Sequence, residues 1–258
     1  MPNYTEVARE ARKKVLELIY KAQTSHIGSN FSAIDIMAVL FEKVDIEKDE
    51  VILSAGWKAA AWYYFLWKKG VITEEELNSF CQEGSKFIGL VEPMNRWGLR
   101  FAGGSMGFGL PAAVGFALSK KLKGEDGKVY VLMSDGELQC GTTWESVLIA
   151  KHNNLDNLVV IVDNNKFQAM GKTEEILSAT TWPLWDETYI WSGVKEIDGH
   201  NFEEINNALD NKNTNIILAN TIKGKGVSFM ENNNLWHYTS PNEEQYKLAL
   251  KELNEKRD

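Results

Sequence analysis

The sequence predicts an α/β fold, as one domain with a mostly parallel sheet that is flanked by helices on both faces. In the second half of the chain, short runs of valine, isoleucine and leucine alternate with longer segments of helical periodicity. Such continuous apolar runs are typical of strands that are buried on both faces. Neither an internal repeat nor a low-complexity linker interrupts the 258 residues. We therefore expect a single domain over residues 1–258.

The first half of the chain is predicted to be mainly helical. Apolar residues at three- and four-residue spacing predict a helix over residues 4–22. A break rich in Gly, Ser and Asn follows, after which Ser32 is expected to cap a second helix over 33–44. VILSAG (51–56) predicts a short strand and a turn. Further helices are expected at 58–70, 74–82 and 110–122, with a glycine-rich irregular stretch at 84–109.

The second half of the chain alternates between strands and helices. VYVLM (129–133) and LVVIV (158–162) are predicted to be buried strands, joined by a helix over 142–153. Crossovers of this kind are right-handed in nearly all parallel sheets. The remaining predicted elements are a strand at 193–197, a helix at 201–211, a strand at 215–221 and a last helix at 243–256.

Composition and charge exclude several classes of protein. The formal net charge of −8 argues against binding of nucleic acid or of a membrane surface. Two cysteines, Cys81 and Cys140, make neither a disulfide framework nor a metal cluster. The amino-terminal segment has no apolar block of a signal peptide, and no run approaches the roughly 18 apolar residues of a membrane span. We expect a soluble, cytoplasmic protein.

Polar residues follow the two most strongly predicted strands. Asp135 and Gly136 come directly after VYVLM, and Asn165 comes shortly after LVVIV. Because ligands of parallel sheets bind at the carboxyl ends of the strands, we expect Asp135 and Asn165 on the same rim. A carboxylate and an amide oxygen suit Mg²⁺ or Ca²⁺, and Gly136 lets an anion approach the backbone. Taken singly, DG and DNN could also be plain turn signals.

The segment SDGELQCGTTWESVLIAKHNNLDNLVVIVDNNKFQAMG resembles the thiamine diphosphate signature of transketolases, which pairs GDG with a downstream Asn. Asp135 and Asn165 are 30 residues apart here (165 − 135). GGSMGFGLPAAVGFAL and KGKGVSFMENNNLWHYTSPNEEQY are similar to two further segments of the family. The resemblance covers nearly the whole chain. It implies the amino-terminal, diphosphate-binding (PP) domain of transketolase, as found in split, two-subunit enzymes.

This resemblance implies a cofactor, a metal and a set of site residues. The cofactors would be thiamine diphosphate and Mg²⁺ (or Ca²⁺), with Asp135, Asn165 and the carbonyl of Phe167 as metal ligands. His26 and His237 match family histidines near the substrate and the diphosphate, and would be catalytic. The cofactor-binding set implied by the motifs is Gly104, Ser105, Met106, Asp135, Gly136, Glu137, Asn165, Ala169 and His237.

The chain departs from the family pattern on the substrate side. Trp57 stands where the family has the histidine of L-S-x-G-H, and Leu90 stands where it has the histidine of G-H-P. Cys140 replaces a glutamate of the family's Q-E-G. Since the two lost histidines would face a ketose donor, the replacements predict a smaller or less hydroxylated donor, such as pyruvate.

The resemblance implies a two-carbon (ketol) transferase subunit that needs a separate subunit. That partner would carry the pyrimidine domain and its activating Glu, and the pair would form a heterotetramer acting on sugars or 2-oxoacids. One alternative is a thiamine-dependent 2-oxoacid decarboxylase or acetyl transferase, and another is a non-catalytic scaffold or regulatory homologue. A nucleotide-binding protein is disfavoured, because the glycine-rich segment 104–109 follows no predicted strand and no Walker A motif occurs.

Overall fold

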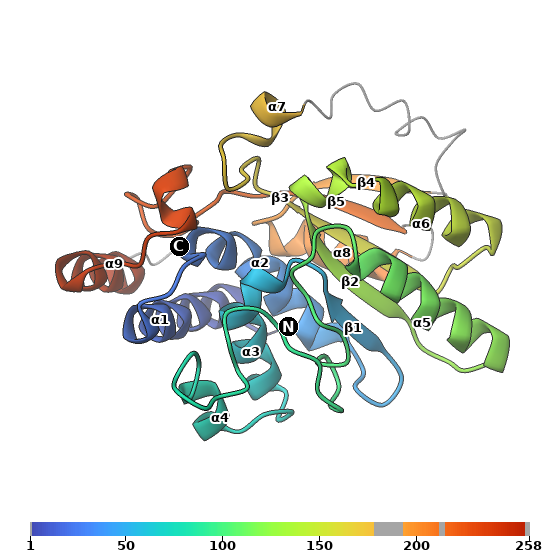
Figure 1. The fold of residues 1–258 in the computed structure, drawn as a ribbon, viewed down its shortest axis with the longest axis horizontal. Coiled ribbons are helices and arrows are strands. Elements are labelled where there is room, and N and C mark those ends of the chain that lie inside the picture. Colours follow the sequence, from blue (N-terminus) through green and yellow to red (C-terminus); the bar gives the residue numbers. More distant parts are fainter. Residues whose placement is uncertain (1, 178–192, 212–214, 256–258) are drawn as a thin grey trace.

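The computed structural model describes residues 2–177, 193–211 and 215–255, which form a five-stranded sheet between layers of helices (Figure 1). The strand order is β1-β2-β3-β5-β4, and every neighbouring pair is parallel. The predicted fold class is therefore confirmed. The strands are β1 (Glu50–Leu53), β2 (Val129–Ser134), β3 (Leu158–Asn164), β4 (Val194–Asp198) and β5 (Ile216–Asn220).

Apart from the start of the second helix, the long helices lie close to their predicted positions. The long ones are α1 (Tyr4–Ala22), α2 (Ile27–Lys43), α3 (Ala59–Lys68), α5 (Gly109–Lys123), α6 (Gly141–His152), α8 (Phe202–Asp210) and α9 (Glu243–Glu255). The short ones are α4 (Glu74–Asn78), α7 (Thr173–Ile176) and the 3₁₀ turns η1 (Gly56–Lys58), η2 (Asp135–Gln139) and η4 (Asn234–His237). Residue 256 of the predicted last helix lies outside the described residues.

Both faces of the sheet are covered, as expected from the apolar strands. α5 and α6 lie over one face, while α1, α2 and α3 lie over the other (Figure 1). Alternate residues of β2 belong to two different hydrophobic clusters: Val131 and Met133 pack with α5 and α6, and Tyr130 and Leu132 pack in the larger cluster with α2 and α3. Because side chains alternate between the faces, a strand covered twice must be apolar throughout.

The start of α2 corrects the sequence prediction. The helix begins at Ile27, so Ser32 lies inside it, fully buried, and caps nothing. Its hydroxyl donates instead to the carboxylate of Asp163 at 2.6 Å, and its oxygen lies 3.0 Å from the carbonyl oxygen of Ser29. Gly28 packs closely in this first turn, since a Cβ atom there would lie 3.1 Å from the side chain of Lys223. Close tertiary packing has therefore overridden the local signal for a break.

Within the described ranges, no helix is both long enough and apolar enough to cross a membrane. The predicted helix over 74–82 ends already at Asn78, and residues 84–108, all of which are described, contain neither helix nor strand, as predicted. This stretch passes close to the end of β1, where the backbone of Gly103 would contact a Cβ atom added at Gly56 at 2.3 Å. This contact places the glycine-rich stretch beside the carboxyl ends of the strands.

Candidate functional site

The carboxyl ends of β2 and β3 meet at one rim of the sheet. Ser134 at the end of β2 pairs with Asp163 in β3, so Asp135 and Asn165 follow on the same rim, as predicted. A cavity of about 370 Å³ opens there. It is lined by His26, Ser29, Trp57, Gly104, Met106, Ser134, Asp135, Gly136, Asn165, Phe167, Gln168, Ala169, Met170, His237 and Tyr238.

Most of the site residues predicted from the sequence line this cavity, but Ser105 and Glu137 do not. Glu137 is fully buried beneath it and accepts hydrogen bonds from the backbone N–H groups of Ser134 (2.8 Å) and Gly107 (3.2 Å), and from the hydroxyl of Ser54. It thereby ties the loop after β2 to the glycine-rich stretch. Ser105 lies in the turn of that stretch, where its carbonyl accepts from the N–H of Phe108.

The buried carboxylate of Asp135 is held by hydrogen bonds, without an ion pair to any residue that the structure describes. Its Oδ1 accepts from the N–H of Gly136 (2.9 Å) and its Oδ2 from the hydroxyl of Thr173 (2.8 Å). Burial, together with the charge of Asp163, raises the pKa of Asp135 to about 6. A group in this state gains stability from a bound cation, so the donor chemistry fits a divalent metal.

Asn165 offers a second oxygen ligand from the other strand end. Its side-chain NH₂ lies 3.2 Å from Oδ2 of Asp163, and its Oδ1 accepts from the N–H of Phe167 at 3.0 Å. No group of three His, Cys, Asp or Glu side chains in the described part of the chain could hold a metal. A cation here would therefore be held by Asp135, the amide oxygen of Asn165, main-chain carbonyls and oxygens of a ligand, which suits Mg²⁺ or Ca²⁺.

Two buried lysines supply positive charge to the site, and sequence reasoning missed both. Lys223 is fully buried, and its ammonium donates to Oδ1 of Asn234 (2.7 Å) and to Nδ1 of His237 (2.9 Å). Since an ammonium can only donate, Nδ1 of His237 is the acceptor and the ring proton is on Nε2. Burial and the charge of Lys58 lower the pKa of Lys223 to about 8.

His26 and His237 lie together on one wall of the cavity, with ring centroids 4.8 Å apart. Burial and the charge of Lys58 lower the pKa of His26 to about 4, and burial and the charge of Lys223 lower that of His237 to about 3. Both rings are therefore neutral near pH 7. They can donate or accept single hydrogen bonds to a bound molecule, but they add no charge.

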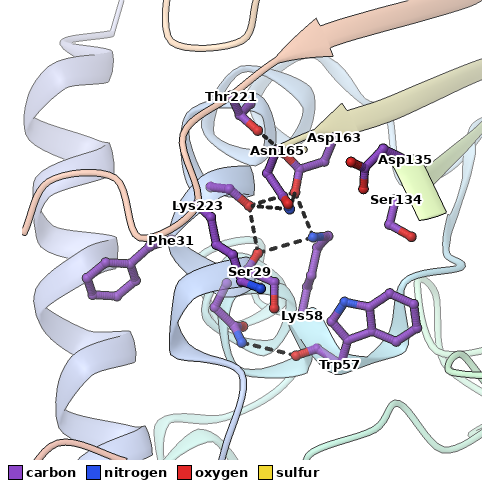
Figure 2. Close-up of polar contacts among 12 residues, drawn as sticks. Ser29, Phe31, Trp57, Lys58, Ser134, Asp135, Asp163, Asn165, Thr221 and Lys223 are labelled. Carbon is purple, nitrogen blue, oxygen red and sulfur yellow. Dashed lines mark hydrogen bonds and ion pairs between the residues drawn. The ribbon is translucent and has the colours of Figure 1, made fainter. Parts of the chain in front are cut away.

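The second lysine, Lys58, belongs to a network around Asp163 (Figure 2). The two form an ion pair of 2.6 Å in which neither side chain is exposed. Hydroxyls of Ser32 and Thr221 also donate to the Asp163 carboxylate. Burial opposes ionisation, but the charge of Lys58 and these hydrogen bonds outweigh it and lower the pKa of Asp163. One signal was available: a charged residue within a buried strand requires a partner.

The three departures from the family pattern lie in or behind a second wall of the cavity, which is formed by Trp57, Gly104 and Met106. Trp57 lines the cavity, and its place on the substrate side stays a prediction. Leu90 packs against Gly104, where an added Cβ atom would meet its side chain at 3.1 Å. Cys140 packs behind Gly107, and burial raises the pKa of its thiol. This wall is therefore more apolar than the rim formed by the strand ends.

Comparison with known proteins gives the same family as the sequence motifs. Residues 4–254 match the family described as transketolase, thiamine diphosphate-binding domain. The chain is 32% identical to one subunit of the apulose-4-phosphate transketolase of Phocaeicola vulgatus, covering 95% of this chain and 92% of that protein. It is 34% identical to a 6-deoxy-6-sulfo-D-fructose transketolase subunit of a Clostridium species, over 95% of this chain and 93% of that one.

Solved structures of longer proteins have the same fold. The transketolase of Campylobacter jejuni superposes with a TM-score of 0.89 at 27% identity, over 98% of this chain and 43% of that one. The transketolase of Leishmania mexicana superposes with a TM-score of 0.87 at 24% identity, which supports the fold alone. The chain thus spans less than half of these solved proteins, but nearly all of the two relatives from Phocaeicola and Clostridium.

Proposed function

This chain belongs to the family of transketolase thiamine diphosphate-binding domains, and we propose that it is the cofactor-binding subunit of a split, two-component ketol transferase. The observation that supports this most directly is the meeting of Asp135 and Asn165 at one cavity rim. Their spacing matches the family's cofactor motif, and the two relatives from Phocaeicola and Clostridium, which match over nearly their whole length, are named transketolase subunits.

Particular residues of this chain would hold the cofactor and its metal. Asp135, Asn165 and the carbonyl of Phe167 would ligate Mg²⁺ or Ca²⁺, and the backbone of Gly136 would meet the diphosphate. His237, which is a hydrogen-bond donor at Nε2, would bind an anionic or carbonyl oxygen, with the charge of Lys223 behind it. When bound, the thiazolium supplies the nucleophilic carbon and stores the carbanion. Ring contacts would come from Gly104, Met106 and Ala169.

A partner subunit is the second part of the proposal. Large apolar side chains around the cavity mouth are exposed: Met170 by 88%, Tyr238 by 65% and Met106 by 39%. Exposed apolar surface beside a cavity is typical of an interaction site. We assign this surface to a separate subunit with the pyrimidine domain and the activating Glu, and propose a heterotetramer. Sugars are the proposed substrates, since the two relatives are named for the sugars apulose 4-phosphate and 6-deoxy-6-sulfo-D-fructose.

A second candidate function is favoured by Trp57. An indole in the cavity wall gives a hydroxylated donor fewer hydrogen-bonding partners than a histidine would, and so favours a smaller donor such as pyruvate. The reaction would then release CO₂ and transfer an acetyl unit. Release of CO₂ from pyruvate by the two-subunit complex supports this candidate, whereas turnover of xylulose 5-phosphate at ordinary transketolase rates contradicts it.

Calorimetric titration with thiamine diphosphate tests the main proposal. We expect binding by the full chain in the presence of Mg²⁺ and its loss when the metal is chelated. Catalytic turnover is expected only after addition of the partner subunit. Cofactor-dependent turnover by the isolated chain would contradict the two-component proposal, and failure to bind with or without the partner would contradict the cofactor assignment.

A further inference from the structure

The amide of Asn165 can serve a metal only in one of its two orientations. An amide presents an acceptor oxygen at one end and an NH₂ donor at the other, and a cation binds only the oxygen. In this structure the NH₂ group lies 3.2 Å from Oδ2 of Asp163 and 3.4 Å from the hydroxyl oxygen of Ser32. Because an ionised carboxylate only accepts, it fixes which end of the amide turns inward. The oxygen is then left for the rim, where it accepts from the N–H of Phe167.

Asp163 is itself held from several directions. Lys58 at the end of η1 and Ser32 in α2 each donate to Oδ2 at 2.6 Å, and Thr221 after β5 donates to Oδ1. The donors come from three segments that are distant in sequence, and they converge on the carboxylate between β3 and α2 (Figure 2). Since neither Asp163 nor Lys58 is exposed, these bonds are shielded from bulk water. The three donors therefore hold the carboxylate of Asp163 in one orientation.

Lys58 has a different part in this arrangement. A fully buried carboxylate is costly unless a charge compensates it, and removal of one partner of such a pair is strongly destabilising. Lys58 also donates to the carbonyl of Ser29, a residue that lines the cavity. Lys58 thus compensates the charge of a buried acceptor at residue 163, two residues before Asn165.

We infer that Asp163 is a positioning residue, with Lys58 as its counter-ion, and that it presents the Asn165 amide oxygen to the divalent metal. This inference rests on the proposed function. Residues behind a metal ligand commonly set its orientation, and their loss weakens metal affinity by about 10–100-fold. The geometry predicts the same size of effect here.

Two double variants separate the hydrogen bond from the charge. Lys58→Met/Asp163→Leu and Lys58→Met/Asp163→Asn both remove the ion pair, but only the second keeps an oxygen that can accept from Asn165. The measurement is Mn²⁺ affinity of the full chain at saturating thiamine diphosphate, from the electron paramagnetic resonance signal of free Mn²⁺. We expect affinity about 10–100-fold weaker for the leucine variant and close to wild type for the asparagine variant.

A matched control is offered by the other buried ion pair, between Arg12 and Asp35 (2.7 Å). Arg12→Met/Asp35→Leu is an equally severe change away from the rim, and it should leave Mn²⁺ affinity unchanged. Should the leucine variant lack a cooperative melting transition, Lys58→Met/Asp163→Ser replaces it, since the oxygen of serine is one bond closer to the backbone than the Oδ2 atom that contacts Asn165. The same loss of affinity is then expected.

The outcomes distinguish the two levels of the proposal. Equal Mn²⁺ affinity of the asparagine variant and the folded leucine or serine variant would overturn the positioning role, as would an equal loss in the Arg12/Asp35 control. Wild-type protein that binds no Mn²⁺ with thiamine diphosphate would instead overturn the proposed function itself. Wild-type binding with a loss confined to the leucine or serine variant supports both.

Discussion

The two walls of the cavity differ in how they are built. At the strand ends, Asp163 and Lys223 are fully buried and hydrogen-bonded to neighbours within the same domain. On the opposite wall, Trp57 and Met106 present apolar surface, and Met106 is 39% exposed. The first wall is held by buried polar contacts within this chain, while the second consists of apolar side chains without such a network among the described residues.

The two walls are therefore expected to determine different properties of the site. Buried polar networks are rigid when every group is satisfied, so the strand-end wall can hold a charged ligand in one geometry. An apolar wall that is partly exposed can be covered by the surface of another protein. Single substitutions in such a wall can change which substrate the site accepts. We therefore expect substitutions on the first wall to change cofactor and metal binding, and those on the second to change donor selection.

Asp135→Ala should give the largest effect on binding. The substitution removes the only carboxylate among the proposed metal ligands, so metal-dependent thiamine diphosphate affinity should fall by more than about 100-fold. Calorimetry with Mg²⁺ measures this, and circular dichroism checks that the fold persists. Retention of wild-type affinity by a folded Asp135→Ala variant would defeat the assignment of the strand-end wall to the cofactor.

Asp135→Asn should stabilise the metal-free chain. The folded-state pKa of about 6 lies above the ordinary 3.8, so ionisation of Asp135 disfavours the folded state at neutral pH. The variant should therefore exceed wild type in free energy of unfolding by up to about 3 kcal/mol above pH 6. The advantage should shrink as pH falls from 6 towards 4, where the wild-type carboxyl is protonated. Urea unfolding at pH 7.5 and pH 4.5 measures it, and a pH-independent difference would argue against a raised pKa.

The sequence predicts the parts of the strand-end wall that depend on local order. β2 and β3 are continuous apolar runs, and their ends place Asp135 and Asn165 together because parallel strands in register end at one rim. The rest depends on contacts between distant segments. Lys58 and Asp163 are 105 residues apart in the chain, and no local pattern pairs them.

The prediction for Ser32 was wrong for the same reason. Its Gly-Ser-Asn surroundings indicate a break, but the segment continues as a helix because Gly28 packs on Lys223 and Ser32 bonds to Asp163. Lys223 lies in the loop after β5, and Asp163 lies in β3. A buried polar residue in a helix is therefore a sign of a tertiary partner that local signals cannot identify.

Lys223→Met should test whether the charge behind His237 belongs to the cofactor wall. The hydrogen bond from an ammonium to Nδ1 would be lost, and a positive charge near the proposed diphosphate position would disappear. We expect cofactor affinity to fall by about 10-fold. Because Lys223 lowers the pKa of His237, that pKa should rise from about 3 in the variant. A nuclear magnetic resonance titration of the His237 ring follows this change. An unmoved His237 titration would exclude the coupling.

Trp57→His should change donor choice with the smallest effect on binding. Trp57 lines the cavity without belonging to the network around Asp163, so thiamine diphosphate affinity should stay near wild type. An imidazole at this position can hydrogen-bond a donor hydroxyl that the apolar indole wall cannot serve, and a site with such a partner discriminates more strongly for hydroxylated donors. In the two-subunit complex, the ratio of kcat/KM for a ketose phosphate to that for pyruvate should rise by about 10-fold. Trp57→Phe, which keeps the wall apolar, is the control and should leave the ratio unchanged. A rise in both variants would mean that size alone sets the donor, and loss of cofactor affinity in either would show that the two walls are not separable.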